Sequence, residues 1–221
     1  MTAIQVSSVL TDVASYINQD PTAPTGTDLT MWINLVNQAQ NEWADVYQWK
    51  QLRNTINLTV NLSQVSFGLP ANFKKMMSPV YDYSVGPNQP TQYYEIPPQQ
   101  RFQAATTDKY VYILGNAITG YSLNLNPAAA SGASLVFDIQ TTVSSLATGN
   151  DTVTCPSQQY LSLRTMAKIL SARSDPRFPQ VYSESQNLLS SMMEEEASLS
   201  GGTDNTVPNQ YHLNNFRIGE S

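Results

Sequence analysis

Residues 29–62, LTMWINLVNQAQNEWADVYQWKQLRNTINLTVNL, decide the fold because the spacing of their apolar side chains changes partway along. In the first half the spacing is three or four residues, the period of one helix face; these positions are Leu29, Trp32, Val36, Ala39, Trp43, Val46 and Tyr47. Past Arg53 apolar and polar side chains alternate, as in a strand, with Ile56, Leu58, Val60 and Leu62 on one side. The stretch therefore predicts a long aromatic helix that leads directly into a strand.

Helical patterns also occur toward both ends of the chain. An apolar stripe over residues 6–17 predicts a first helix, and two more helices are predicted after Ser157 and from about Pro179. The run Glu194 to Glu196 on the last helix predicts a solvated face. Four amphipathic helices thus surround the middle of the chain.

The middle of the chain reads as strands separated by Gly, Pro and Asn clusters typical of turns. These strand patterns cover residues 76–83, 110–114, 121–125 and 134–141. Because the four helical stripes have only one another to bury against, the fold class predicted is α+β, with a four-helix bundle and an inserted antiparallel β-domain. The predicted parts are the bundle at 1–53 and 154–200, the β-domain at 54–153 and an extended C-terminal arm at 201–221.

Composition restricts the function. Only 13% of the 221 residues are charged, the net charge is -6 and the pI is about 4.6, so no global positive field attracts phosphates and a conventional nucleic-acid binder is not expected. The single cysteine, Cys155, excludes an intrachain disulfide and is expected to be a small buried hydrophobe. With neither a secretory signal pattern nor a run of about 18 apolar residues, we expect a soluble protein made in a cytoplasm.

Sequence motifs of catalysis are missing. The chain contains no phosphate loop, no dinucleotide fingerprint and no G-x-S-x-G elbow, and its one histidine, His212, lies in the polar tail. We therefore expect no enzyme and no catalytic, cofactor-binding or metal-binding residues. A carbohydrate-binding module or glycan hydrolase with a carboxylate pair stays the alternative. Core and sheet packing is the favoured interpretation for the tyrosines that would line its sugar site: Tyr81, Tyr83, Tyr93, Tyr94, Tyr110, Tyr112 and Tyr121.

Several short stretches, taken in order, resemble the head-to-tail adaptor (connector or neck) proteins of tailed bacteriophages. They are the helix with Trp43 that enters the strand Ile56 to Leu62, the turn phrase Leu69-Pro70-Ala71-Asn72-Phe73-Lys74, the stretch Ile118 to Asn126 followed by Pro127, and Leu135-Val136-Phe137-Asp138. The helix pair and the tail follow, so that the resemblance spans about residues 3 to 200.

The resemblance implies a structural virion protein of the neck, assembled in the host cytoplasm. In such proteins twelve copies form a ring under the portal that continues the DNA channel to the tail, and the C-terminal extension docks on the portal. The partners implied are the portal protein, a tail or nozzle protein, further copies in a dodecamer, and genomic DNA that passes without specific binding; no membrane and no cofactor are implied. A tail-completion protein is the alternative within the same class.

The tail of the chain carries the residues expected to bind the portal. Apolar and aromatic groups gather there after a Gly-Gly pair and a polar run; the set is Tyr211, His212, Leu213, Phe216, Arg217 and Ile218. Trp32 and Trp43 are expected to fill the core, with a subunit interface as the alternative for either.

Overall fold

The computed structural model describes residues 3–18, 22, 24–62, 64–84, 90–105 and 107–199, and the chain forms two compact units. The helical unit contains the residues up to Ala39, the segment Ala147–Thr152 and the described residues from Pro156 onward. The strand unit contains Gln40–Leu146 and Val153–Cys155. The division between the units therefore falls inside the second helix, not at its end.

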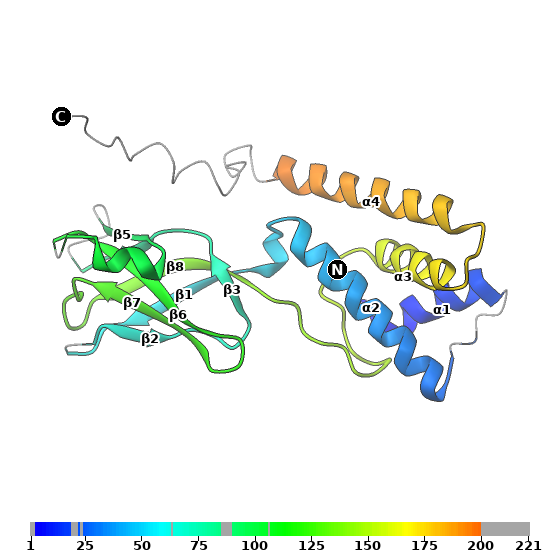
Figure 1. Cartoon of the computed structure of the whole chain (residues 1–221), viewed down its shortest axis with the longest axis horizontal. Coiled ribbons are helices and arrows are strands. Elements are labelled where there is room, and N and C mark those ends of the chain that lie inside the picture. Colours follow the sequence, from blue (N-terminus) through cyan, green and yellow to red (C-terminus); the bar gives the residue numbers. More distant parts are fainter. Residues whose placement is uncertain are drawn as a thin grey trace. The chain divides into compact units, whose positions relative to one another are not determined.

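The helical unit is built from four helices, of which the second continues into the strand unit (Figure 1). Their bounds are α1 Val6–Asn18, α2 Gly26–Val46, α3 Gln158–Ala172 and α4 Phe178–Leu199. α1 packs against α3, and α3 packs against α4. Each helix buries its apolar stripe, as in the fully buried Val9 of α1 and Leu170 of α3.

Backbone and side-chain groups satisfy the free amides at the helix starts. The N–H groups of Val6 and Ser7, which have no partner inside α1, donate to the carbonyl oxygens of Asp151 and Gly149 at 3.0 and 2.8 Å. At the start of α3 the Ser157 hydroxyl accepts from the N–H of Tyr160 at 3.1 Å. The segment 147–152 thus holds the first turn of α1 although it is remote in sequence.

The strand unit contains one eight-stranded sheet in the order β1-β8-β4-β5-β6-β7-β2, with β3 also paired to β8. The strands are β1 Arg53–Thr59, β2 Ser66–Gly68, β3 Phe73–Met76, β4 Val80–Asp82, β5 Thr91–Glu95, β6 Tyr110–Asn116, β7 Gly120–Asn126 and β8 Ser134–Thr141. Short 3-10 helices, η1 Lys50–Leu52 and η2 Pro98–Phe102, precede β1 and follow β5. All pairs are antiparallel except β5 and β6, which run parallel.

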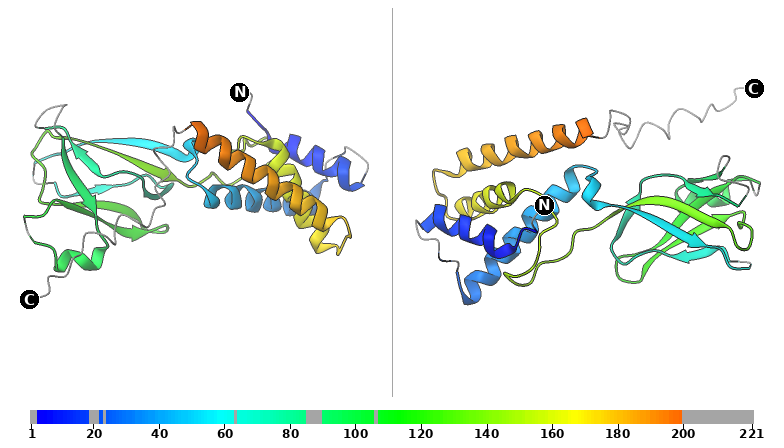
Figure 2. Two further views of the ribbon diagram at one scale, coloured as in Figure 1. Left: turned by 90° about the horizontal axis from the view of Figure 1, so that it is seen from above. Right: turned by 180° about the vertical axis from the view of Figure 1, so that it is seen from behind.

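The sheet is curled, as the two views of Figure 2 show. It encloses an apolar core of its own side chains. Alternate side chains from most of its strands point inward, so that Phe67 of β2, Val111 of β6 and Phe137 of β8 belong to one buried cluster. A curled sheet that buries one face in this way needs no helix to cover that face.

The predicted four-helix bundle with an inserted antiparallel β-domain is wrong, although the mixed α+β content is compatible with the structure. The second half of α2 buries Gln40, Trp43 and Ala44 within the strand unit, so the stripe of this helix is shared between two cores. The parallel pair β5–β6 also contradicts a purely antiparallel sheet. Residues 96–109, which include η2, separate these strands and make the crossover that parallel pairing requires.

Candidate functional site

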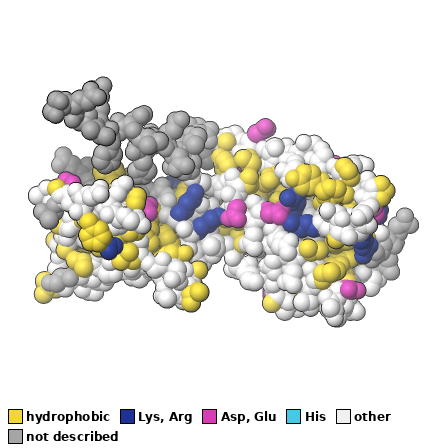
Figure 3. Space-filling view, viewed as in Figure 1, with side chains coloured by type: hydrophobic (Ala, Val, Ile, Leu, Met, Phe, Trp, Pro, Cys, Tyr) yellow, Lys and Arg dark blue, Asp and Glu magenta, His cyan; other side chains and the backbone are white. Residues whose placement is uncertain are grey.

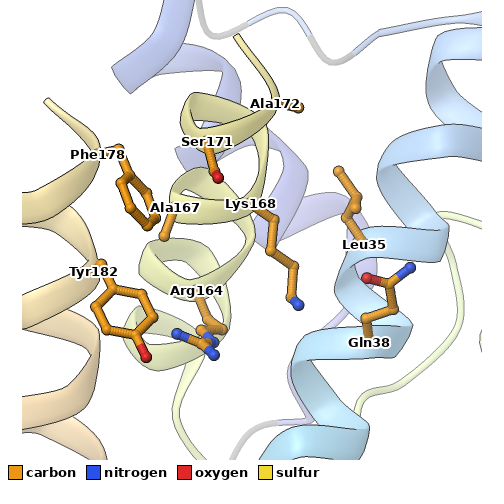
Figure 4. Close-up of a pocket in the computed structure, with 9 residues that line it drawn as sticks. All are labelled: Leu35, Gln38, Arg164, Ala167, Lys168, Ser171, Ala172, Phe178 and Tyr182. Atoms are coloured by element: carbon orange, nitrogen blue, oxygen red, sulfur yellow. The ribbon is translucent and has the colours of Figure 1, made fainter. Parts of the chain in front are cut away.

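A groove of about 420 Å³ lies in the helical unit, lined by side chains of α2, α3 and α4 (Figure 4). Its apolar lining includes Leu35 from α2 and the aromatic rings of Phe178 and Tyr182 from α4. Its polar lining includes Arg164 and Lys168, which are four residues apart on α3 and so lie on one helix face. Figure 4 shows Lys168 extending from α3 toward α2, and Arg164 extending toward Tyr182.

Ring contacts and charge define the chemistry of this groove. The guanidinium carbon of Arg164 lies 4.7 Å from the centroid of the Tyr182 ring, which is a cation–π distance. The rings of Phe178 and Tyr182 are 5.6 Å apart, and Tyr182 is 40% exposed. Figure 3 shows hydrophobic side chains close to basic ones on one face of the helical unit, with acidic side chains beside the basic ones. The groove therefore combines aromatic surface with two basic side chains.

The turn between α3 and α4 positions the aromatic wall of the groove. Asp175 accepts hydrogen bonds from the backbone N–H of Arg177 at 2.9 Å and from its guanidinium Nε and Nη2 at 3.0 and 2.8 Å. These bonds lower the pKa of Asp175 to about 2. The carbonyl oxygen of Asp175 also accepts from the N–H of Phe178 at 3.0 Å, which ties the first residue of α4 to the same turn.

The tip of the β6–β7 hairpin presents one exposed apolar side chain. Ile118 is 95% exposed. The side-chain oxygen of Asn116 accepts from the N–H groups of Ile118 and Thr119 at 2.8 and 3.0 Å, so the turn is internally hydrogen-bonded. These hydrogen bonds hold the turn that carries the exposed isoleucine at the tip of the hairpin.

A second candidate surface lies at one end of the strand unit. It is the end opposite the one where the chain connects to α2 and to residues 142–146. The pairs Thr59↔Ser134, Asp82↔Leu135 and Tyr110↔Asn126 bring the loops after β1, β4 and β7 and the loop before β6 to this one end. Leu62 in the first of these loops is 82% exposed. We call this surface the loop end.

The structure places only some of the predicted site residues. The six tail residues Tyr211, His212, Leu213, Phe216, Arg217 and Ile218 lie outside the described residues. Trp32 and Trp43 are buried, with 3% and 0% of their surface exposed, and Cys155 is buried as predicted. The groove residues Arg164 and Lys168 were not singled out from sequence, although two basic residues one turn apart on a helix with no other charged side chain were the available indication.

Trp43 stacks on Trp49 in the strand unit, with ring centroids 4.9 Å apart. The Trp49 indole N–H donates to the Trp43 carbonyl oxygen at 2.6 Å. Nearby, Gln40 is fully buried; its amide group donates to the Ser144 carbonyl at 3.1 Å and accepts from the Thr154 N–H at 2.6 Å. The end of α2 therefore holds both chain segments that leave the strand unit.

The described residues offer little for metal or sugar chemistry. Across them, no three His, Cys, Asp or Glu side chains are grouped so as to hold a metal ion. Among the tyrosines considered for a sugar site, Tyr93 and Tyr110 are buried in the sheet while Tyr94 is 57% exposed. Within the same described part of the chain, no helix has the length and apolar character needed to cross a membrane.

Comparison with known proteins identifies the family. The model of the SU10 adaptor protein family matches residues 4–210, which is nearly the whole chain. No curated protein matches the chain. The resemblance to phage head-to-tail adaptors is thereby confirmed: the chain belongs to the SU10 adaptor protein family.

Proposed function

We propose that the chain is a structural subunit of a phage virion neck that joins the portal to the tail. The family match over residues 4–210 is the observation that carries this proposal. The architecture supports it, because a helical unit and a strand unit offer two separate surfaces for two different partners. In this role the protein has no catalytic activity and assembles in the host cytoplasm.

The subunits form a ring, a dodecamer by analogy with head-to-tail adaptors, which continues the DNA channel below the portal. A low charge density and a net charge of -6 per chain suit a lumen through which DNA slides during ejection without being held by phosphate contacts.

Residues 201–221 bind the portal through Tyr211, Leu213, Phe216 and Ile218, assisted by His212 and Arg217. The sequence suits an arm, because a Gly-Gly pair and a polar run precede the apolar residues, and a chain of up to about 3.3 to 3.6 Å per residue is long enough to cross a neighbouring subunit. Repetition around the ring multiplies a modest affinity per arm.

The loop end of the strand unit binds the tail or nozzle protein. Its exposed Leu62 and its Pro- and Gly-containing turn at residues 127–132 are features of surfaces that adapt to a partner. A tail-completion protein is the alternative, and it would bind tail components without requiring a portal.

The decisive experiment mixes the purified chain with the portal of the same phage and images the product by electron microscopy. We expect a ring on the portal, and a chain truncated after Ser200 that melts at an unchanged temperature but no longer joins the portal. An intact chain that binds tail protein while ignoring the portal would favour the tail-completion alternative. A truncated chain that melts clearly lower yet still binds the portal would refute the role of the arm.

A further inference from the structure

We infer that β1 receives an extended segment of the tail-side protein, which adds to the sheet as a further strand. This inference rests on the proposed tail contact and names how that contact is made. β1 is the last strand at one end of the sheet and pairs only with β8, so its other edge has no neighbouring strand in the described part of the chain. We call this side of β1 the β1 edge.

Hydrogen bonds of β8 show which backbone groups of β1 face the β1 edge. The carbonyl oxygen of Asp138 accepts from the Met77 N–H at 2.8 Å, and the Asp138 N–H donates to the Ser78 hydroxyl at 2.9 Å. Both backbone groups of Asp138 therefore point away from β1. Thr55 is opposite Asp138 in register, and in an antiparallel pair two such residues both point away from each other. The N–H and C=O groups of Thr55 therefore face the β1 edge.

The same orientation recurs at every second residue of β1. The bond from the Val60 N–H to the Ala133 carbonyl oxygen, at 3.0 Å, fits this alternation because it places Val60 on the paired side. The residues whose backbone groups face the β1 edge are thus Thr55, Asn57 and Thr59, and all three are exposed. No described residue bonds to these backbone groups. Such an edge is a template for pairing with another chain.

The other two strands with a single neighbour, β2 and β3, are protected against such pairing. β2 has only three residues. The pairing of β3 shifts register between Phe73 and Lys75, and this strand carries two lysines, Lys74 and Lys75. Short strands, bulges and lysines are the means by which native sheets prevent edge pairing. β1 has none of them: it has seven residues, pairs with β8 without a shift, and carries no charged side chain after Arg53.

The two faces of β1 set the chemistry of the added strand. Ile56 and Leu58 are half-buried and pack against the core of the sheet, whereas Asn57 and Thr59 are exposed on the opposite face. A neighbouring strand continues both faces, so its side chains alternate between apolar groups beside Ile56 and Leu58 and polar groups beside Asn57. The partner is therefore an extended segment with this alternation.

The geometry favours the tail-side protein over a second copy as the source of this segment. Pairing of the β1 edge with the β1 edge of another copy is isologous and closes a dimer, not a ring. The protected strands β2 and β3 of another copy are poor partners for the reason given above. β1 also leads at Thr59 into the loop end with its exposed Leu62, which is the surface proposed for the tail protein.

Hydrogen exchange at single amides tests the inference on the wild-type chain. It is measured on rings bound to the portal, before and after purified tails of the same phage are added. The amides of Ile56 and Leu58, which pair with β8, should be protected already before tails are added. Exchange at Thr55, Asn57 and Thr59 should slow at least about tenfold on tail binding, because only strand addition protects alternate amides along β1.

Proline substitution tests the same point by affinity. Asn57→Pro removes an N–H that faces the β1 edge and keeps the bonds to β8, so tail binding should weaken at least about tenfold as a carbonyl of the partner is left unpaired. Asn57→Ala keeps that N–H, and Ser66→Pro removes an outward N–H from β2, since the adjacent Val65 carbonyl faces β7. Both controls should bind tails within about threefold of the wild type. Circular dichroism melting verifies that each variant is folded.

Tails that bind without slowing exchange at Asn57 overturn the inference and leave the proposed function standing. Slow exchange at Asn57 before tails are added also overturns it, because a second copy or the portal then occupies the β1 edge. A folded Asn57→Pro variant that binds tails like the wild type, or an Asn57→Ala variant that is equally impaired, overturns it as well. Tails that fail to bind wild-type rings refute the proposed tail contact together with this inference.

Discussion

At the scale of single residues, Trp43 is the most informative side chain of α2. It is fully buried and stacked on Trp49, yet its indole N–H has no hydrogen-bond partner within the described part of the chain. Its contribution to stability therefore comes from packing and burial of ring surface, and not from polar bonds.

Replacing this tryptophan tests whether it is part of the monomer core. Trp43→Ala should lower the free energy of unfolding by about 3 to 5 kcal/mol, because the cavity it leaves is enclosed. Met31→Ala, on the same helix but at a position that is 48% exposed, should change it by less than about 0.5 kcal/mol. Urea denaturation measures both values. A loss below about 1 kcal/mol for Trp43→Ala, combined with failed ring assembly, would place this ring at a subunit contact instead.

The lowered pKa of Asp175 predicts that the stability of the fold depends on pH. Hydrogen bonds from Arg177 lower its pKa to about 2, from an ordinary value of 3.8. A lowered pKa in the folded state means that stabilisation is present above the unfolded value and is lost as the pH falls toward the folded value. Asp175→Asn should therefore melt below the wild type at pH 7, with a difference that shrinks between about pH 4 and pH 2.

The melting temperature of each variant is measured across this pH range. Arg177→Gln is the matched variant because it removes the donor of the same interaction. The two variants should follow the same pH profile. A melting difference that stays constant down to pH 2 would show that the carboxylate titrates alike in the folded and unfolded states.

At the scale of elements, the β6–β7 hairpin depends on one glycine. Gly115 has a φ of 104°, and a Cβ at this position would lie 2.0 Å from the carbonyl oxygen of Gly120 across the hairpin. Both the backbone strain and the clash oppose any side chain here. The close approach of the two strands therefore shapes the turn that carries Ile118.

We expect Gly115→Ala to destabilise the chain by about 1 to 3 kcal/mol or more, since strain and overlap both contribute. Gly68→Ala is the control, because its added methyl group has nothing within 4 Å and its φ is not in the left-handed region. Chemical denaturation compares the two variants. Equal stability would mean that the hairpin opens at no cost, and the rigidity of its tip would then be refuted.

Local patterns predicted single elements better than their pairing. The stripe from Leu29 and the alternation from Ile56 located α2 and β1, because periodicity indicates which side chains are buried. Both patterns extended too far: Val46 is 45% exposed, and Leu62, which is 82% exposed, lies past the end of β1. The short strands β2 and β5 were not predicted, since three to five residues carry too little pattern. The parallel pairing of β5 with β6 depends on contacts across 14 intervening residues, 96–109, and has no local indication.

At the scale of the whole molecule, the predicted four-helix bundle was wrong because a local pattern does not show which elements pack together. An amphipathic stripe shows that α2 is buried on one side, but not what buries it. Trp43 and Gln40 are buried by the strand unit, while Trp32 belongs to the helical unit, so one helix serves two cores. The groove could not be predicted for a related reason: Arg164 and Tyr182 are brought together only by the packing of α3 against α4.

The net charge of the whole chain predicts weak binding to duplex DNA. Seventeen acidic and 11 basic side chains leave a net charge of -6, and ring formation would multiply this negative charge around the channel. Binding of double-stranded DNA depends on neutralising phosphates with clustered basic residues and releasing their counterions. We therefore expect the chain, free or assembled, to bind duplex DNA with a dissociation constant weaker than about 100 μM at about 150 mM salt. Fluorescence anisotropy with a labelled duplex measures this, and binding near 1 μM that weakens steeply with salt would show instead that the channel holds its DNA by phosphate contacts.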